Sequence, residues 1–195
     1  ANGFVRERSG LMTAGVPTLY SKLLQHFEEQ GRGAGTMERL VVAGSAPAPS
    51  MIEGFERLGV SVNHVWGMTE MTQGSSGRLT NRVAGLGREE HRARQAKAGR
   101  ELYGVELRVV NDGGVVVPRD GESLGELQTR GPWVAGSYYR HNDDSTHEPA
   151  EAGGWLKTGD VATLDHEGYI TIVDRAKDVI KSGGYGAIGS HGQHH

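Results

Sequence analysis

The feature that most constrains the fold of this chain is a strand–helix–strand pattern in its first third. Residues 39–43 and 60–66 are short apolar stretches typical of buried strands, and residues 50–58 between them place their apolar side chains on one helical face. A connection of this kind between parallel strands is right-handed, and the two strands then end at the same edge of the sheet. The sequence therefore predicts that the loops at 44–49 and 66–70 lie side by side, where α/β sheets hold their ligands.

Local signals predict how the neighbouring segments fold. Pro17 suits the first turn of a helix over residues 17–30. Ser50 and Glu53 have the spacing of a capping box, which predicts that Ser50 caps the second helix. Residues 77–100 are charged and without period, which is typical of a mobile loop or a solvated helix.

The hydrophobic pattern changes after residue 101, where apolar side chains begin to alternate with polar ones. Alternation with a period of two indicates strands that bury one face. The expected strands cover residues 105–110, 115–118, 125–130, 161–164 and 169–173. We therefore predict the α/β fold class, with a parallel βαβ sheet portion followed by a mostly antiparallel, distorted β-barrel portion.

Composition excludes several classes of protein. With 21 Lys and Arg against 24 Asp and Glu, the net charge of −3 does not fit a strongly basic nucleic-acid binder, so we expect no nucleic-acid partner. The chain has no cysteine, which rules out a disulfide scaffold and a cysteine nucleophile or metal ligand. Apolar runs are far shorter than the roughly 20 residues of a membrane span, and the first residues lack the apolar core of a signal peptide. We therefore expect a cytoplasmic protein without a transmembrane segment.

The two neighbouring loops form the first candidate ligand site. Small residues in the first loop let a flat ring approach the backbone, and Trp66 offers an aromatic face for stacking. Thr69 offers a hydroxyl and an N–H where a phosphate would sit, and the carboxylate of Glu70 is a hard oxygen ligand suited to Mg²⁺. The simpler alternative is two ordinary turns with a solvent-facing Glu70. The candidate residues are Gly44, Ser45, Ala46, Pro47, Trp66, Gly67, Met68, Thr69 and Glu70.

A second candidate site combines Asp160, at the end of residues 157–160, with Arg175. A carboxylate accepts hydrogen bonds from both hydroxyls of a ribose, and an arginine donates to the same sugar or to a phosphate. The alternative is a surface aspartate and a surface arginine in hairpin turns.

Two further motifs have simpler interpretations. Residues 121–125 satisfy the G-x-S-x-G pattern of serine hydrolases, but a nucleophile elbow needs a strand before Ser123 and a helix after it. Here a strand pattern follows, so a serine esterase or lipase is kept only as the alternative function.

The end of the chain is a glycine-rich stretch without period that contains His191, His194 and His195. We interpret it as a disordered tail, with a metal site at these histidines as the alternative.

Both candidate sites belong to longer strings that together resemble one family. The strings cover residues 15–18, 66–70, 125–133, 154–160 and 174–184. In order and spacing they resemble the adenylate-forming superfamily of acyl- and aryl-CoA synthetases, luciferases and peptide-synthetase adenylation domains. The branch that the chain resembles most is that of medium- or long-chain fatty acyl-CoA synthetases.

The resemblance implies a two-step reaction that uses ATP, Mg²⁺ and CoA. A fatty or other carboxylic acid attacks the α-phosphate of ATP to give an acyl-adenylate and pyrophosphate, and the thiol of CoA then displaces AMP. Thr69 would contact the α-phosphate, and Glu70 would hold Mg²⁺. His64 would lie near the acyl carboxylate, although a lone histidine in a strand is equally a structural residue. The nucleotide would contact Gly44, Ser45, Ala46, Pro47, Trp66, Gly67, Met68, Asp160 and Arg175, and the family's hinge would fall at Lys177.

Two parts of the family pattern have no counterpart in the sequence. One is a phosphate loop rich in Ser, Thr and Gly that ends in Lys, for which residues 33–37 are no substitute because no Lys follows them. The other is a late catalytic Lys in a small C-terminal domain. We therefore expect an internal piece of the family's large domain that does not turn over by itself and binds AMP weakly. A non-catalytic nucleotide-binding or structural remnant is the other class left open.

On this interpretation the chain divides into four parts. Residues 1–76 form a partial α/β adenylate-binding subdomain, and residues 77–173 form a β-rich subdomain. Residues 174–184 form the hinge segment, and residues 185–195 form a disordered or tag-like tail. Apolar area exposed at the cut surfaces would cause self-association or pairing with the missing half.

Overall fold

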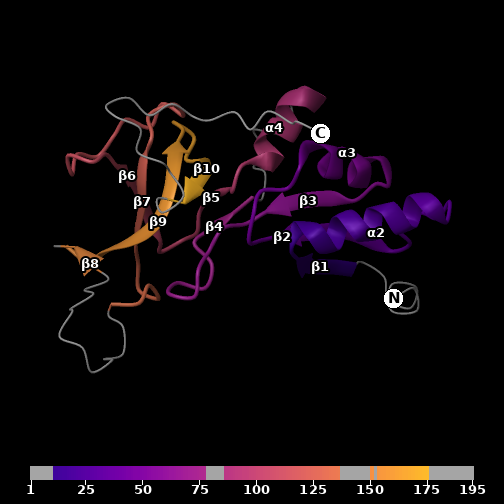
Figure 1. Ribbon diagram of the computed structural model, residues 1–195, viewed down its shortest axis with the longest axis horizontal. Coiled ribbons are helices and arrows are strands. Elements are labelled where there is room, and N and C mark those ends of the chain that lie inside the picture. The colour runs from indigo at the N-terminus through magenta and orange to yellow at the C-terminus, as the bar shows by residue number, and fades with distance from the viewer. Residues whose placement is uncertain (1–10, 78–85, 137–149, 152, 176–195) are drawn as a thin grey trace, which may run out of the picture.

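The chain folds into two parts that lie side by side, as a computed structural model shows (Figure 1). The structure describes residues 11–77, 86–136, 150–151 and 153–175. Strands β1 to β3 with helices α2 and α3 make up the α/β part, and strands β6 to β10 make up the β-rich part. The expected α/β fold class, with a parallel portion and then an antiparallel one, is confirmed.

The α/β part is built on a three-stranded parallel sheet in the order β1-β2-β3. Its strands are β1 (Leu11–Gly15), β2 (Met37–Val42) and β3 (Ser61–His64). Gly15 pairs with Val42, and Val42 pairs with His64, so all three strands end at one edge. This confirms the expected strand–helix–strand unit and adds strand β1, which the sequence did not reveal.

Two helices cover one face of this sheet: α2 (Pro17–Glu29) and α3 (Pro49–Arg57). The rings of Tyr20 and Phe55 meet edge to face, with centroids 6.1 Å apart, above the buried side chain of Leu40. Each fully buried apolar side chain of this kind contributes about 1.5–3 kcal/mol, so the face that packs on the helices anchors the sheet.

The expected capping box at the start of α3 is wrong. Ala48 is the N-cap residue, Pro49 occupies the first turn, and no side chain caps the helix. The fixed φ of Pro49 suits the first helical position. The helix therefore starts one residue early, and Ser50 lies inside it.

The charged segment after residue 77 contains a helix, α4 (Arg88–Ala96), rather than a loop throughout. It packs against α3 and β3, where Arg92 donates to Glu56 at 2.5 Å and the Nε2 of buried Gln95 donates to the carbonyl of Val62 at 3.3 Å. The helix therefore packs on the α/β part, and its Arg94 also reaches the β-rich part, where it pairs with Glu167 and lies over the ring of Tyr169.

A short two-stranded ladder lies near the junction. Strand β4 (Ser75–Ser76) pairs antiparallel with β5 (Arg100–Glu101). The ladder connects the end of the 66–74 loop to the chain that follows α4.

The β-rich part is an antiparallel sheet in the order β10-β9-β7-β6. Its strands are β6 (Glu106–Val110), β7 (Gly125–Arg130), β9 (Trp155–Leu164) and β10 (Ile170–Arg175), and the short β8 (Ala150–Glu151) pairs with β9. The expected strands at 105–110, 125–130, 161–164 and 169–173 are confirmed, and β9 starts six residues earlier than expected. The expected strand at 115–118 is reduced to one bridge between Val110 and Val116.

The core of the β-rich part includes side chains from both parts of the chain. Leu107, Leu127, Ala162 and Ile170 come from its own strands. Trp66, from the loop after β3, is buried in the same cluster together with Met71 and Ala98. The loop that carries the first candidate site is therefore anchored in the second core.

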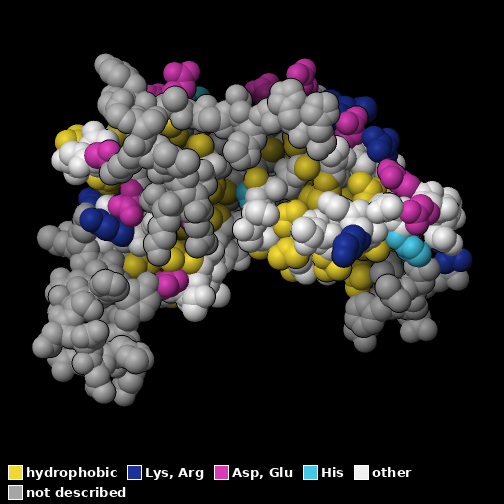
Figure 2. Space-filling model, viewed as in Figure 1, with side chains coloured by type: hydrophobic (Ala, Val, Ile, Leu, Met, Phe, Trp, Pro, Cys, Tyr) yellow, Lys and Arg dark blue, Asp and Glu magenta, His cyan; other side chains and the backbone are white. Residues whose placement is uncertain are grey.

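Among the residues described, no helix has the length and apolar content that a membrane crossing requires. Hydrophobic side chains are nevertheless visible on the surface of the α/β part (Figure 2). Met12, Val16 and Leu19 are the large exposed ones there, and Met12 is 62% exposed.

Candidate functional site

The carboxyl edge of the parallel sheet brings the two predicted loops together. Ala43 donates its N–H to the carbonyl of Gly15 at 3.0 Å, and Val65 donates to the carbonyl of Val42 at 2.9 Å. The first loop turns away at Gly44, whose φ of 89° is a conformation that glycine adopts readily. Gly44, Ser45 and Ala46 are exposed and Pro47 is buried. The first loop therefore presents small, accessible residues at this edge.

The second loop, residues 66–74, closes on itself through backbone hydrogen bonds. Gly74 and Ser75 donate to the carbonyl of Trp66 at 2.9 and 3.0 Å, and the N–H of Trp66 donates to Ser75 Oγ at 3.1 Å. A Cβ at Gly67 would lie 2.2 Å from the carbonyl oxygen of Thr72, closer than any real contact. Glycine at position 67 is therefore a condition for the loop to close.

The central contact of the site joins the two parts of the chain. Trp66 Nε1 donates a hydrogen bond to Asp160 Oδ2 at 2.7 Å, across 94 positions of sequence. Each of the two residues is only 8% exposed. The contact links the predicted loop to the predicted ribose residue, which the sequence treated as two separate candidates.

Asp160 lies at an irregularity of strand β9. Glu126 pairs with Val161 and Gln128 pairs with Lys157, so three residues of β9 stand opposite Leu127 alone. Gly159, one of these three, has a φ of 72°. Bulges of this kind redirect side chains and are common beside functional sites.

Local hydrogen bonds fix the bulge. The N–H of Asp160 donates to Thr158 Oγ1 at 3.1 Å, and that hydroxyl donates to the carbonyl of Leu127 at 2.7 Å. Arg175 stands opposite Asp160 in the ladder between β9 and β10. The backbone therefore places the two predicted ribose residues next to each other.

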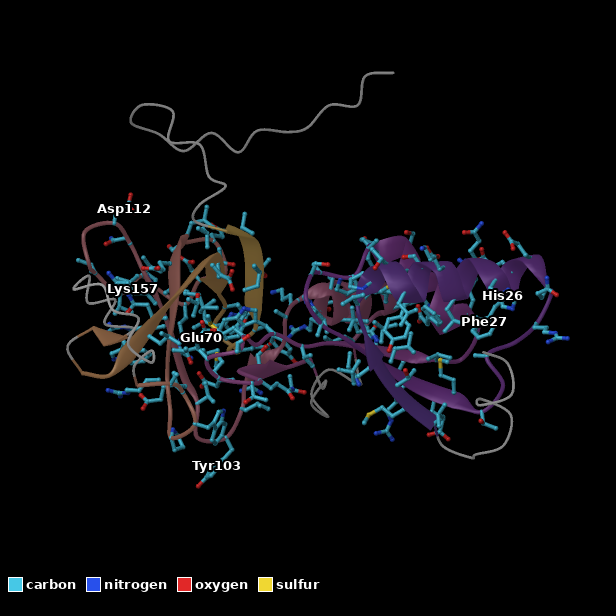
Figure 3. All side chains as sticks on the ribbon, turned by 60° about the horizontal axis from the view of Figure 1, so that its bottom comes forward. His26, Phe27, Glu70, Tyr103, Asp112 and Lys157 are labelled. Carbon is cyan, nitrogen blue, oxygen red and sulfur yellow. The ribbon has the colours of Figure 1, made fainter. Side chains whose placement is uncertain are left out.

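Thr69 and Glu70 continue the second loop toward the β-rich part. Thr69 is exposed and Glu70 is half-buried, and the N–H of Ala135 donates to the carbonyl of Glu70 at 2.7 Å. Figure 3 shows Glu70 among the side chains of the β-rich part. Met68 packs against the second core.

The side chains at this site fit a magnesium ion only if a bound nucleotide supplies further oxygen ligands. In the parts of the chain that the structure describes, no group of three or more His, Asp or Glu side chains is arranged to hold a metal ion. Mg²⁺ is commonly bound by one or two carboxylates together with substrate phosphates. A single carboxylate at Glu70 is compatible with that mode, and the other ligands would come from the nucleotide and water.

His64 is held in a structural contact. It is 4% exposed, and its Nδ1 donates to the carbonyl oxygen of Ala96 at 2.9 Å. Burial lowers the pKa of the imidazole, and its hydrogen bonds to the backbone of Ala96 and Lys97 oppose that effect. The contact ties β3 to the end of α4, which supports the structural alternative for this residue.

The G-x-S-x-G segment is a turn rather than a nucleophile elbow. Asp120 accepts hydrogen bonds from the N–H and the hydroxyl of Ser123 at 2.7 and 2.6 Å, and these bonds lower the pKa of Asp120 to about 2. Residues 117–124 form no strand, and β7 follows instead of a helix. The strand–serine–helix context of a hydrolase is therefore absent from this segment.

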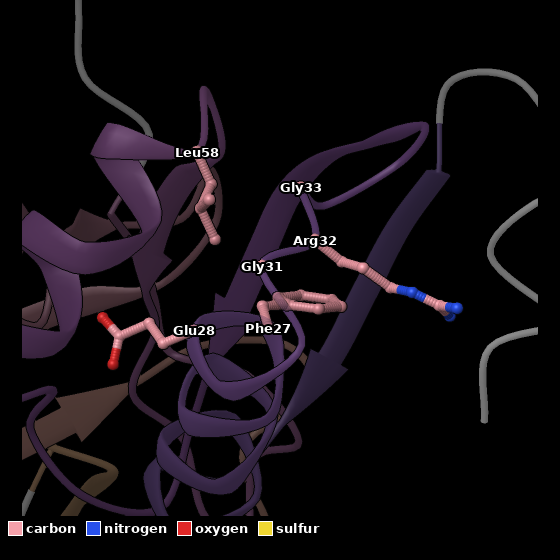
Figure 4. A pocket seen from close by; sticks show the side chains of 6 residues that line it. All are labelled: Phe27, Glu28, Gly31, Arg32, Gly33 and Leu58. Carbon is pink, nitrogen blue, oxygen red and sulfur yellow. The ribbon is translucent and has the colours of Figure 1, made fainter.

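Two cavities lie beside the parallel sheet of the α/β part. One of about 340 Å³ lies where α2 ends, at the opposite edge of the sheet (Figure 4). It is lined by Phe27, Glu28, Gly31, Arg32, Gly33 and Leu58. The other, of about 490 Å³, is lined by Met12, Arg39, Val41, Ser61, Asn63, Val65, Gln73, Ser76 and His91. Neither includes a predicted site residue.

Comparison with known proteins identifies the family. A family model described as AMP-binding enzyme matches residues 4–139. The chain belongs to the AMP-binding enzyme family. A long-chain-fatty-acid–CoA ligase of Thermus thermophilus is 43% identical over 173 residues, and a 3-methylmercaptopropionyl-CoA ligase of Ruegeria pomeroyi is 43% identical over 172 residues. Both of these relatives of the AMP-binding chain carry the names of CoA ligases.

The solved structures agree with this assignment. O-succinylbenzoate coenzyme A synthetase from Bacillus subtilis, in complex with ATP and magnesium ion, superposes with a TM-score of 0.71 at 31% identity. The match covers 89% of this chain and 33% of that one. For the Thermus and Ruegeria ligases the coverage is 88% and 87% of this chain but 32% and 31% of the relatives. The AMP-binding chain therefore spans about one third of the length of the relatives it matches.

Sequence analysis did not predict one contact within the site. Trp66 and Asp160 were each predicted to contact the nucleotide, but nothing in the pattern indicated that they contact each other. Gly159 was the available signal, since a glycine inside a strand suggests a bulge. The expected hinge at Lys177 and the histidines at 191, 194 and 195 lie outside the described residues.

Proposed function

We propose that this chain is the nucleotide-holding portion of an ATP-dependent carboxylate–CoA ligase. The reaction joins a fatty or other carboxylic acid to the α-phosphate of ATP, releases pyrophosphate, and transfers the acyl group from AMP to the thiol of CoA. The observation that carries the proposal is the hydrogen bond between Trp66 and Asp160, which brings the predicted phosphate loop and the predicted ribose residue into one site. The CoA ligase names of the relatives support the same reaction class.

The adenosine would be held between the two loops and strand β9. The exposed small residues at 44–46 leave room for the adenine ring against the backbone. The carboxylate of Asp160 would accept hydrogen bonds from the ribose hydroxyls, and Arg175 beside it in the ladder would donate to the sugar or to a phosphate. These groups bind and orient the nucleotide.

The phosphates would lie over the second loop. Thr69 is exposed at this point and would donate to the α-phosphate, where negative charge grows as the carboxylate attacks. Glu70 would hold Mg²⁺, which neutralises phosphate charge when it is bound. His64 was expected near the acyl carboxylate, and because its Nδ1 proton is donated to Ala96, that contact would have to be made by Nε2.

Turnover by this chain alone is not expected. Each charge-assisted hydrogen bond contributes about 1.5–3 kcal/mol. Without a phosphate loop and a late catalytic Lys, the chain would lack more than about 5 kcal/mol of transition-state stabilisation, which is over a thousandfold in rate. We also propose that the exposed apolar side chains of the α/β part cause self-association, and that the protein works in the cytoplasm without a nucleic-acid partner.

Calorimetry on the 195-residue chain tests the proposal. We expect binding of AMP and of an acyl-sulfamoyl adenosine that mimics the acyl-adenylate. Glu70→Gln should weaken ATP binding only when Mg²⁺ is present, and Glu38→Gln, an exposed residue outside the site, should change nothing. Absence of binding by all three nucleotides would contradict the proposal, and ATP-dependent acyl-CoA formation by the chain would contradict the expected lack of turnover.

A further inference from the structure

We propose that Trp66 is a positioning residue that aims the carboxylate of Asp160 at the ribose through its indole N–H. This inference rests on the proposed function and gives Trp66 a role beyond that of an aromatic surface beside adenine. Its basis is the 2.7 Å hydrogen bond from Nε1 to Oδ2 between two residues that are almost fully buried.

The donor is held rigidly. The backbone of Trp66 takes part in three hydrogen bonds, with Gly74, with Ser75 N–H and with Ser75 Oγ, and Ser75 Oγ in turn donates to the carbonyl of Ala98. A Cβ at Gly74 would lie 2.5 Å from the Cζ3 atom of the indole, so the ring packs directly on the glycine backbone. The position of Nε1 is therefore set by the loop and not by a flexible side chain.

The acceptor, Asp160, lies at a point of β9 where the strand alone does not determine the direction of the side chain. Asp160 follows the positive φ of Gly159 within a three-residue bulge of β9. The β10 ladder opposite is irregular too, between Ile172 and Asp174. Regular pleating does not dictate side-chain direction at such a point. The indole N–H of Trp66, which lies outside the strand, orients the carboxylate instead.

The chemistry of the pair suits a sugar site. An indole has one N–H and no acceptor, so it donates in a single direction and leaves the negative charge on Asp160. A carboxylate has about four lone-pair positions, and the indole bond at Oδ2 occupies one of them.

The experiment compares AMP with 2′,3′-dideoxyadenosine monophosphate, which lacks both ribose hydroxyls. The wild-type 195-residue chain should prefer AMP. Trp66→Phe keeps a ring but removes the N–H, and it should reduce that preference by about tenfold or more, as expected for loss of a hydrogen bond to a charged group. Binding of the dideoxy nucleotide should change much less.

Three further variants separate positioning from folding. Asp160→Asn should reduce the same preference, and adding Trp66→Phe to it should have little further effect. Trp155→Phe is the matched control, because this ring lies outside the site, with the guanidinium groups of Arg108 and Arg130 at 4.2 and 4.6 Å from its centroid. If Trp66→Phe fails to fold, substitution of Trp66 by its benzothienyl analogue removes the N–H and keeps the shape.

The outcomes distinguish the positioning role of Trp66 from the proposed function on which it rests. An unchanged AMP preference in a folded variant that lacks the N–H would overturn the positioning role and leave the proposed function standing. An equal loss of affinity for AMP and for the dideoxy nucleotide would also overturn the positioning role, because it indicates a purely structural contact. Absence of AMP binding by the wild-type chain would overturn the proposed function and this inference with it.

Discussion

The closure of the 66–74 loop depends on Gly67, and Gly67→Ala tests that dependence. The added Cβ would lie 2.2 Å from the carbonyl oxygen of Thr72 and 2.8 Å from the Cα of Gln73. Both are backbone atoms, so no side chain is able to swing away and the loop itself must shift. Overpacking of this kind costs about 1–3 kcal/mol. For a chain of this size that corresponds to a fall of about 2–12 °C in Tm.

The assay for this variant is urea unfolding followed by AMP titration. The shift of the loop should also displace Trp66, whose carbonyl accepts the bond from Gly74, and we expect AMP affinity to fall about tenfold, equivalent to about 1.4 kcal/mol. Gly33→Ala is the matched control, because a Cβ there meets nothing within 4 Å. A Gly67→Ala chain with wild-type stability and wild-type AMP affinity would refute the reasoning.

Phe55→Ala, which empties the fully buried site against Tyr20, should cost about 3–5 kcal/mol in urea unfolding, and a loss below 1 kcal/mol would contradict the packing. Burial lowers the folded-state pKa of His64, so the free energy of unfolding is full above pH 6.5 and falls as the pH drops below that value. The free energy of unfolding should therefore change less between pH 7.5 and pH 5 in His64→Gln than in the wild-type chain. An equal change in both proteins would contradict the prediction. Ser123→Ala should raise the pKa of Asp120 from about 2 toward 3.8, as NMR titration of the carboxyl carbon would show, and a pKa that stays near 2 would exclude the hydroxyl as its main cause.

The parallel sheet edge was predictable because it rests on local patterns. Two apolar stretches flank an amphipathic helix, and the right-handed crossover rule then fixes where both strands end. Strand β1 was not predictable, because Leu11–Gly15 is short and contains a glycine and an alanine. Its place in the sheet comes from pairing with Met37–Val42, which is a tertiary interaction.

The site was predictable as a set of residues but not as an arrangement. The loop at 66–70 and the residue Asp160 carry recognisable motifs. Their contact depends on a bulge around Gly159 and on the burial of Trp66 in the core of the other part, and neither has a local signature strong enough to predict. For His64 the sequence left two interpretations open, and only the contact with Ala96 favours one of them.

Photolabelling of the chain with 8-azido-AMP, followed by peptide mapping, tests most directly whether the two loops and strand β9 hold an adenylate together. The account predicts adducts within residues 44–47 or 66–70, suppressed by excess AMP and strongly reduced in Asp160→Asn. Adducts that are confined to the cavity at the end of α2, or that Asp160→Asn leaves unchanged, would contradict it.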